Sequence, residues 1–297
     1  MKTKFTLVLA CILLVAAGST VLAESKLHLK VITGSPEGFW VNSTLVYGEK
    51  DAILIDAPFT QIDALRVAMA LLESKKNLTT VYVTHGHPDH YFGLGIIRQV
   101  FPNAKLVAIP AVVEDAKQTG ADKIKVWKPM YGDNLTANLV LPEAMAGTTL
   151  TLEGETLQIV TGIRGDTMSN STYIWIPSLK AVISGDIVFA GLHPWTAEST
   201  PATRKEWIKA LESISALKPE IVVPGHKNPA LKDDPSSLVF MKDYLTYFDE
   251  ALAASGTRDE FVAKVKGKYP NLGLDIILNL GADASFKEKM NKEKKER

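Results

Sequence analysis

The sequence predicts one α/β domain, and three observations support this expectation. The chain has 297 residues, a length that suits one large α/β domain or two small ones. Segments typical of strands and segments with helical spacing of apolar residues follow one another along it, with no internal repeat and no linker long enough to separate domains. The hydrophobic share of 46% and the charged share of 22% are ordinary for a globular protein and exclude disorder of the whole chain.

The first half of the chain alternates between predicted strands and helices. Ile62–Ser74 is expected to be helical, because its apolar residues recur at roughly helical spacing. A second helix is expected at His90–Val100 and is closed by Pro102. Short apolar segments predict the strands around these helices: Leu27–Thr33, Phe39–Tyr47, Ala52–Asp56, Val81–Val83 and Lys105–Ile109.

The second half begins with residues 121–147, which fit no simple period and are expected to be an insertion or an extended connection. Thr203 followed by Glu206 predicts the capping box of a helix that stops at Pro219. Helices from Pro235 onward are expected to complete a domain of residues 24–286, and residues 287–297 form a charge-rich tail that is expected to be solvated. Strands are predicted at Thr149–Leu152, Thr156–Val160, Ser171–Trp175, Ala181–Ile183 and Ile221–Val223.

The first residues have the three-part pattern of a secretory signal. Two lysines precede the apolar run Phe5–Ala17, and Val21-Leu22-Ala23 supplies small residues at the cleavage positions. A transmembrane anchor would need about 20 unbroken apolar residues, and Gly18-Ser19-Thr20 ends the run before that. Lipidation at Cys11 is disfavoured, because the apolar core continues beyond it. We expect residues 1–23 to be removed and the mature chain to be secreted or periplasmic, without a membrane anchor.

The charge of the mature chain argues against polyanionic partners. Removing Lys2 and Lys4 with the signal leaves 31 basic residues against 33 acidic ones, a formal charge of −2, and no cysteine. No disulfide can therefore form, although the compartment would permit one. Because there is no basic stripe with interleaved aromatics, nucleic acid and acidic membranes are not expected as partners. The expected partner is a small-molecule substrate.

The most informative segment is Thr84-His85-Gly86-His87-Pro88-Asp89-His90, in which three imidazoles and a carboxylate fall within six residues. It directly follows the apolar strand Val81–Val83, so the four side chains stand where a strand ends and the chain turns. Neutral imidazole and carboxylate are the ligands that zinc and its first-row neighbours use in hydrolytic sites. The segment therefore predicts a metal site.

The pattern His-x-His-x-Asp-His after an apolar strand resembles the metallo-β-lactamase superfamily, and the resemblance runs from about Lys30 to His226. The other matching segments come in the order of that family: Asn42–Tyr47, Ala52–Asp56, Ser184-Gly185-Asp186 and Pro224-Gly225-His226. The resemblance implies an αββα sandwich with one or two metals at the edges of the sheets.

The resemblance also implies a ligand set. It assigns His85 and His87 to the first metal, and Asp186 to both metals as a bridge. The second metal would be held by Asp89, His90 and His226. Two divalent ions are expected, with Zn²⁺ first and Mn²⁺ or Fe²⁺ as alternatives.

The sequence departs from the family at Gly165-Asp166-Thr167, where the usual pattern is Gly-His-Thr. Asp166 could ligate the first metal through an oxygen, which would make the site more anionic and more favourable to manganese or iron. Alternatively, the first site is weakened and only the second metal binds tightly. Ligation is the favoured reading, because the neighbouring Gly165 and Thr167 are retained.

The implied activity is hydrolysis of an ester, lactone, thioester or amide bond by a metal-bound hydroxide. Asp89 is the candidate that orients this nucleophile and passes a proton to the leaving group. A metallo-β-lactamase proper is an alternative that the export signal favours and the missing third histidine opposes. An iron-dependent sulfur dioxygenase-like oxidoreductase and a non-catalytic binding protein are further alternatives. Serine and cysteine nucleophiles are not expected, because no Gly-x-Ser-x-Gly elbow occurs and the mature chain has no cysteine.

Three other residues are candidates for substrate contact. His193 lies shortly after Asp186, in what should be a loop near the metals, although a lone loop histidine is more often structural. Tyr91 directly follows the ligand motif. Trp40, in the aromatic pair after the turn at residues 34–38, is expected either to pack in the core or to form a flap over the substrate.

Overall fold

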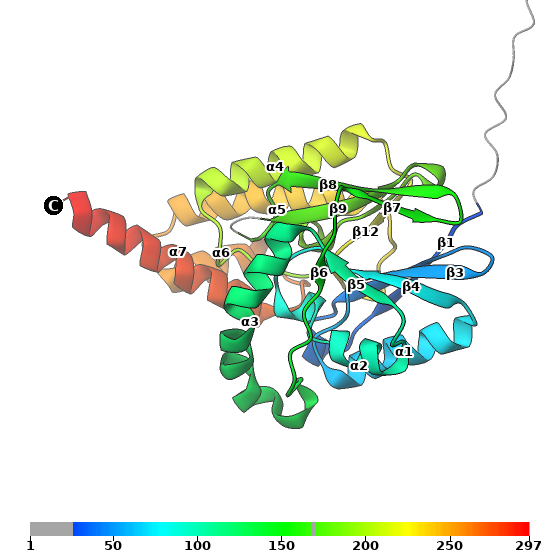
Figure 1. Ribbon diagram of the computed structural model, residues 1–297. Helices are drawn as coiled ribbons and strands as arrows, with labels where there is room; N and C mark the ends of the chain where they lie inside the picture. Colours follow the sequence, from blue (N-terminus) through cyan, green and yellow to red (C-terminus); the bar gives the residue numbers. More distant parts are fainter. Residues whose placement is uncertain (1–25, 168–169, 297) are drawn as a thin grey trace, which may run out of the picture.

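Two β-sheets face each other and carry helices on their outer sides, which confirms the predicted αββα sandwich (Figure 1). The computed structural model describes residues 26–167 and 170–296, with side chains to residue 291. The predicted signal segment lies outside the described residues. Side chains from both sheets, such as Leu45 and Ile174, belong to one apolar core between them. Burial of this core supplies the main favourable term for folding.

The first sheet contains the motif-bearing strand and has the order β1-β2-β3-β4-β5-β6. β1, β2 and β3 pair in antiparallel fashion, whereas β3 to β6 run parallel. Helices α1 (Gln61–Ser74) and α2 (Leu94–Val100) cover its outer face (Figure 1). The strands are β1 (His28–Thr33), β2 (Asn42–Tyr47), β3 (Asp51–Ile55), β4 (Asn77–Tyr82), β5 (Lys105–Ala108) and β6 (Glu143–Ala144).

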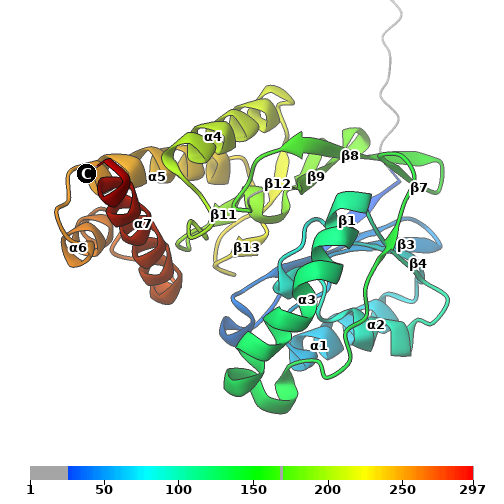
Figure 2. The ribbon, with the colours of Figure 1, turned by 60° about the vertical axis from the view of Figure 1, so that its left-hand side comes forward.

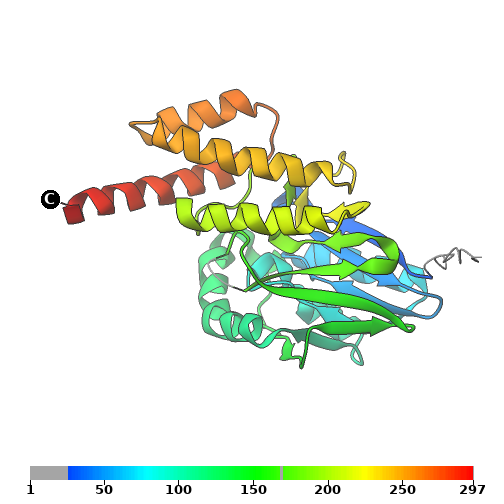
Figure 3. The same cartoon turned by 90° about the horizontal axis from the view of Figure 1, so that it is seen from above.

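The second sheet has the order β12-β10-β9-β8-β7, in which only β10 and β12 pair in parallel fashion. Its strands are β7 (Thr149–Leu152), β8 (Glu155–Ile163), β9 (Ser171–Ile176), β10 (Ala181–Ile183) and β12 (Ile221–Val223). β11 (Phe189–Ala190) and β13 (His226–Lys227) form a small parallel pair beside it. Helices α4 (Pro201–Ala216) and α5 (Ser236–Ala253) lie side by side over its outer face (Figure 3).

Helix α4 begins three residues before the predicted start. Thr200 is its N-cap, and the Thr200 and Thr203 side chains complete a capping box with each other's backbone amides. Pro201 follows at the first helical position, where its missing N–H leaves no unsatisfied donor. The predicted partner Glu206 instead pairs with Arg164 at 3.3 Å. The capping box was therefore predicted one turn too late in the sequence. Thr203 is the third residue of the helix and not its N-cap.

Helix α3 (Pro110–Tyr131) corrects the expectation of an extended connection over residues 121–147. Its buried residues are Val112, Val113, Ala116 and Gly120, and no later residue of the helix is buried. The second half of α3 therefore lacks the apolar period of a core-facing helix. The connection from 135 to 142 is irregular and leads into β6.

Three helices after the second sheet form a separate apolar cluster. α5 packs against α6 (Arg258–Lys268), and α6 packs against α7 (Asp275–Glu296). Tyr244, Phe248 and Phe261 are buried in this cluster. Residues 287–296, expected as a solvated tail, continue the helix α7. Among the described residues, no helix is long and apolar enough to cross a membrane.

Candidate metal centre

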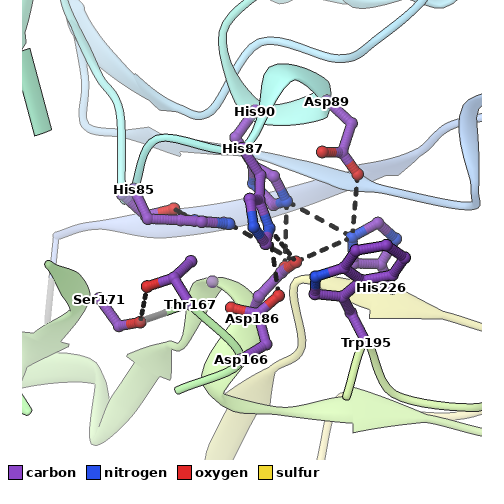
Figure 4. A network of polar contacts seen from close by, with 12 residues as sticks. His85, His87, Asp89, His90, Asp166, Thr167, Ser171, Asp186, Trp195 and His226 are labelled. Atoms are coloured by element: carbon purple, nitrogen blue, oxygen red, sulfur yellow. Dashed lines mark hydrogen bonds and ion pairs between the residues drawn. The ribbon is translucent and has the colours of Figure 1, made fainter. Parts of the chain in front are cut away.

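The predicted ligands come together at one edge of the sandwich, where several strands end (Figure 4). The segment His85–His90 follows β4, and Asp186 lies in η5 (Gly185–Ile187) after β10. Asp166 follows β8, and His226 begins β13. Side chains from both sheets therefore meet at this point. They form two groups of donor atoms, each with all its atoms within 4.8 Å of one another.

The first group consists of His85, His87, Asp166 and Asp186. His85 Nε2 lies 3.5 Å from Asp186 Oδ2, and His87 Nδ1 lies 3.8 Å from the same oxygen. His87 Nδ1 is also 3.1 Å from Asp166 Oδ2. Asp166 is fully buried and stands with the two histidines, at the position where the sequence departs from the family pattern.

The second group consists of Asp89, His90 and His226. His226 Nε2 lies 3.2 Å from Asp89 Oδ2 and 3.4 Å from His90 Nε2. Asp186 also reaches this group, because its Oδ1 is 3.0 Å from His90 Nε2 and its Oδ2 is 3.2 Å from His226 Nε2. Asp186 thus belongs to the first group and also contacts the second.

The burial and bonding of these atoms fit divalent cations. His85 Nε2, both carboxylate oxygens of Asp166 and Asp186 Oδ1 are buried and have no hydrogen bond of good geometry, although ring nitrogens lie nearby. Buried carboxylates are costly unless they are paired or coordinate a metal. Burial lowers the pKa of His85 to about 4, so the imidazole is in its neutral, ligating form. Burial disfavours the charged form of Asp166 as well and raises its pKa to about 8. A bound cation would oppose this shift.

Asp56, at the end of β3, holds two members of the motif in place. Its Oδ2 lies 2.8 Å from His90 Nδ1 and accepts from the Thr84 hydroxyl at 2.8 Å. Its Oδ1 accepts from the Thr84 amide at 2.8 Å. The Thr84 hydroxyl in turn lies 2.9 Å from His85 Nδ1. These contacts turn the Nε2 atoms of His85 and His90 toward the centre, as partners behind metal-ligating histidines do.

His226 is held by an aromatic pair in a strained turn. Its Nδ1 donates to the Phe39 carbonyl at 2.7 Å, and its ring stacks on Phe189 with centroids 5.0 Å apart. Phe39 and Trp40 have positive φ angles of 59° and 52°, a conformation that costs about 1–3 kcal/mol for each residue. This turn directs the Phe39 carbonyl toward His226. It also places the Phe39 ring in the wall of a cavity beside the two donor groups.

Close backbone approach explains the glycine of the Pro-Gly-His turn. A Cβ atom on Gly225 would overlap Asp186 Oδ1 and the backbone of Gly185. The Gly225 amide donates to the Gly185 carbonyl at 2.9 Å. The two turns that carry Asp186 and His226 are therefore packed directly against each other.

A cavity of about 270 Å³ opens onto the donor groups. Sequence reasoning missed most of the residues that shape it. Glu198 Oε1 lies 3.4 Å from His87 Nε2 and 3.4 Å from Trp195 Nε1, and Lys123 Nζ donates to the Gly86 carbonyl at 2.7 Å. The lining consists of Phe39, Phe59, His87, Pro88, Asp89, Lys123, Val126, Trp127, Asp186, Phe189, Trp195, Glu198, His226, Leu274 and Ile277.

The three residues expected to contact substrate do not line this cavity. His193 is buried, with Nδ1 2.8 Å from the Tyr244 hydroxyl, and joins its loop to α5. Tyr91 is fully buried beside Gly120 of α3. Trp40 lies against Gly273, and its neighbour Phe39 takes the place in the cavity. His193 and Tyr91 are directed into the protein by their packing, and Trp40 is half-buried.

Comparisons with known proteins agree with this geometry. The family model "Metallo-beta-lactamase superfamily" matches residues 38–226. No match is found among curated proteins. A metallo-beta-lactamase family protein from Thermus thermophilus is 15% identical, with a TM-score of 0.63, covering 90% of this chain and 94% of that one.

Two solved metallo-beta-lactamases share the fold at similarly low identity. The DIM-1 enzyme, in a crystal exposed to ceftazidime, is 17% identical with a TM-score of 0.55, covering 76% of this chain and 94% of its own. The TMB-1 enzyme is 20% identical with a TM-score of 0.53, covering 75% and 94%. At these identities the likeness concerns the fold alone. The family match ends at His226, so α5, α6 and α7 lie beyond it.

Proposed function

The chain belongs to the metallo-beta-lactamase superfamily, and on that premise we propose that it is a metal-dependent hydrolase of a small-molecule ester, lactone, thioester or amide. The observation that carries the proposal is the position of Asp186, which contacts both donor groups through buried oxygens. A binding protein with a decayed site would have no need for seven ligand-type side chains turned toward one point.

We assign two divalent ions to the site, one to each donor group. The first ion would be held by His85, His87 and Asp166. The second ion would be held by Asp89, His90 and His226, and Asp186 would contact both ions. When bound, such ions lower the pKa of water from 15.7 to about 7 and polarise the oxygen of the scissile bond. Zinc is the first candidate, and Asp166 in place of histidine favours manganese or ferrous iron more than the usual shell does.

The residues of the chain supply position and proton transfer. Asp89 lines the cavity, and its Oδ2 lies 3.2 Å from His226 Nε2. Attraction from that imidazole outweighs burial and keeps the pKa of Asp89 below its usual range. The side chain is therefore ionised, the form in which it would accept a proton from an attacking water molecule, and it would then release that proton to the leaving group. Asp56 and the Phe39 carbonyl keep His90 and His226 oriented.

The test combines metal analysis with a panel of substrates. Protein purified without chelator should contain about two equivalents of transition metal. It should cleave at least one of an aryl ester, a lactone or a thioester. Nitrocefin tests for a β-lactamase proper, and oxygen uptake with a persulfide tests for a sulfur dioxygenase.

Asp186→Ala and His87→Ala should each remove more than nine-tenths of turnover, a barrier increase above about 1.4 kcal/mol, with the circular dichroism spectrum retained. Less than half an equivalent of metal after reconstitution would refute the proposal.

We also propose that the protein is exported, as the pattern of residues 1–23 predicts. Cleavage after Ala23 would give a secreted or periplasmic mature chain. Fractionation of cells that express the full sequence, followed by N-terminal sequencing, tests this. A cytoplasmic protein that retains Met1 would contradict it.

A further inference from the structure

The cavity beside the donor groups has one charged end and an otherwise apolar wall. Its charged lining residues are ligand candidates or contact the ligand motif, since Lys123 binds the Gly86 carbonyl and Glu198 contacts His87. The rest of the lining is apolar or aromatic: Phe39, Phe59, Pro88, Val126, Trp127, Phe189, Trp195, Leu274 and Ile277. Aromatic packing fixes part of this wall, with the rings of Phe39 and Trp127 5.6 Å apart.

Two helices supply the far parts of this wall, and one of them lies outside the segment matched by the family model. Val126 and Trp127 come from α3, and Ile277 comes from α7. In Figure 2, α3 and α7 lie on opposite sides of the β11–β13 pair. The part of the wall that Leu274 and Ile277 supply therefore lies beyond the segment that the family model matches.

The apolar surface continues outside the cavity. Val126 lines the cavity and is 69% exposed, and Met130, one turn further along α3, is also exposed. Val126 therefore extends the apolar wall of the cavity to the surface, where the apolar part of a bound ligand would cover it.

We propose that this cavity holds an apolar acyl chain of the substrate, with the scissile carbonyl at the charged end. This inference rests on the proposed hydrolase function and specifies its substrate class as acyl esters, lactones or thioesters. Water is added across the acyl bond, which yields a carboxylic acid and an alcohol or thiol. A polyanionic substrate such as a nucleotide is disfavoured, because Lys123 is the only lysine or arginine among the described residues of the lining and already binds a carbonyl.

The first experiment measures kcat/KM for the acetate, butyrate, hexanoate and decanoate esters of 4-nitrophenol. Each methylene that leaves water can contribute up to about fourfold, so kcat/KM should rise by at least tenfold from acetate to hexanoate. Val126→Asp places a charge on the wall at an exposed position, where it leaves the core intact. It should reduce kcat/KM for hexanoate at least tenfold more than for acetate. Met69→Asp, at a 60% exposed position of α1 outside the cavity, is the matched control and should change neither.

The second experiment measures binding without catalysis. Metal-free protein is titrated with N-phenyl-1-naphthylamine, an uncharged fluorescent apolar probe, and the probe is displaced with decan-1-ol. The wild type and Met69→Asp should bind the probe, and Val126→Asp should bind it at least tenfold more weakly.

The two experiments separate the acyl-chain inference from the proposed function. Hydrolysis with no dependence on chain length, together with no effect of Val126→Asp on probe binding, overturns the acyl-chain inference and leaves the hydrolase standing. Probe binding that Val126→Asp weakens, without hydrolysis of any ester, supports the apolar chain site and counts against the proposed function.

Discussion

Asp166 stands where the family pattern Gly-His-Thr has its histidine. Its carboxylate is fully buried, and burial raises its pKa to about 8, while the imidazole of His87 at 3.1 Å opposes that shift. Neither of its oxygens has a hydrogen-bond partner of good geometry. A buried carboxylate without such partners is stabilised by a cation, so we expect Asp166 to ligate the first metal.

Substitution of Asp166 tests this expectation. Asp166→His should keep two equivalents of metal and shift the ratio of affinities toward zinc over manganese, because imidazole is the softer ligand. Asp166→Ala should lose about one equivalent and most of the turnover. Calorimetric titration of the metal-free proteins with each ion gives stoichiometry and affinity. Equal stoichiometry and equal affinities in the wild type and both variants would remove Asp166 from the site.

Asp56 orients His90 through the contact between its Oδ2 and His90 Nδ1 and is a positioning residue for the proposed metal site. Asp56→Asn retains the size of the side chain and tolerates the φ of 62°, since asparagine adopts this region readily. Its amide would face His90 Nδ1 as a donor and favour the tautomer with a proton on Nε2, which cannot ligate. Zinc affinity should fall about 10- to 100-fold. Asp122→Asn, on the exposed face of α3, is the control. An unchanged zinc affinity in Asp56→Asn would contradict this role.

The sequence was sufficient to predict which donor side chains lie together and insufficient to predict the residues that hold them in place. His85, His87, Asp89 and His90 lie in one short segment, so their chemistry is visible in the order of residues alone. Asp56 acts only because β3 and β4 are parallel neighbours that end at the same edge. Glu198 approaches His87 from a loop more than 100 residues later. Contacts of this kind depend on tertiary structure and leave no periodic pattern.

At the scale of elements, buried strands were predicted better than helices that face a cavity. The predicted strands Ala181–Ile183 and Ile221–Val223 have the observed bounds, because continuous burial selects continuous apolar residues. The whole of α3 was missed, and in its second half Val126 and Trp127 face the cavity while Pro129 interrupts the helical pattern. Val126 and Trp127, which do not fit a helical apolar period, are residues of the cavity wall. In α1, Ile62, Leu65 and Leu72 fit the predicted period but are exposed.

The loop that carries His193 couples the second sheet to the C-terminal helices and should make stability depend on pH. Burial lowers the pKa of His193 to about 4, while Asp275 raises it and Lys266 lowers it further. In the unfolded chain the imidazole titrates near 6.5. Between these values the unfolded state binds a proton that the folded state does not. The free energy of unfolding therefore falls as pH falls through this window.

The His193 contribution should reach roughly 2 kcal/mol between about pH 7 and about pH 5. Urea unfolding of wild type and His193→Gln at both pH values measures it. Glutamine can still bond to the Tyr244 hydroxyl but does not titrate, so the variant should lose less stability on acidification. All other titrating groups are common to the two proteins. Equal losses in both would show that His193 is not the group responsible.

At the scale of the whole molecule, the candidate centre joins the two halves of the sandwich. His85, His87, Asp89 and His90 follow a strand of the first sheet, whereas Asp166 and Asp186 follow strands of the second. A metal bound to both sets is absent from the unfolded chain, so its binding free energy adds to the free energy of unfolding. Without such a metal, the buried carboxyl groups of Asp166 and Asp186 would lie close together with no cation between them.

Chelation should therefore lower the thermal stability of the whole protein in one cooperative step. A ligand at about 1,000 times its Kd contributes about 4 kcal/mol, which corresponds to a Tm shift on the order of 10 °C for a domain of this size. Differential scanning calorimetry of the purified protein, with and without EDTA, measures this shift, and added zinc or manganese should reverse it. Asp186→Ala lacks the carboxylate that contacts both donor groups, so its Tm should respond little to either treatment. If EDTA leaves the wild-type Tm unchanged although elemental analysis confirms that the metal is gone, the ions do not join the two halves. Stability would then come from the apolar core between the sheets alone.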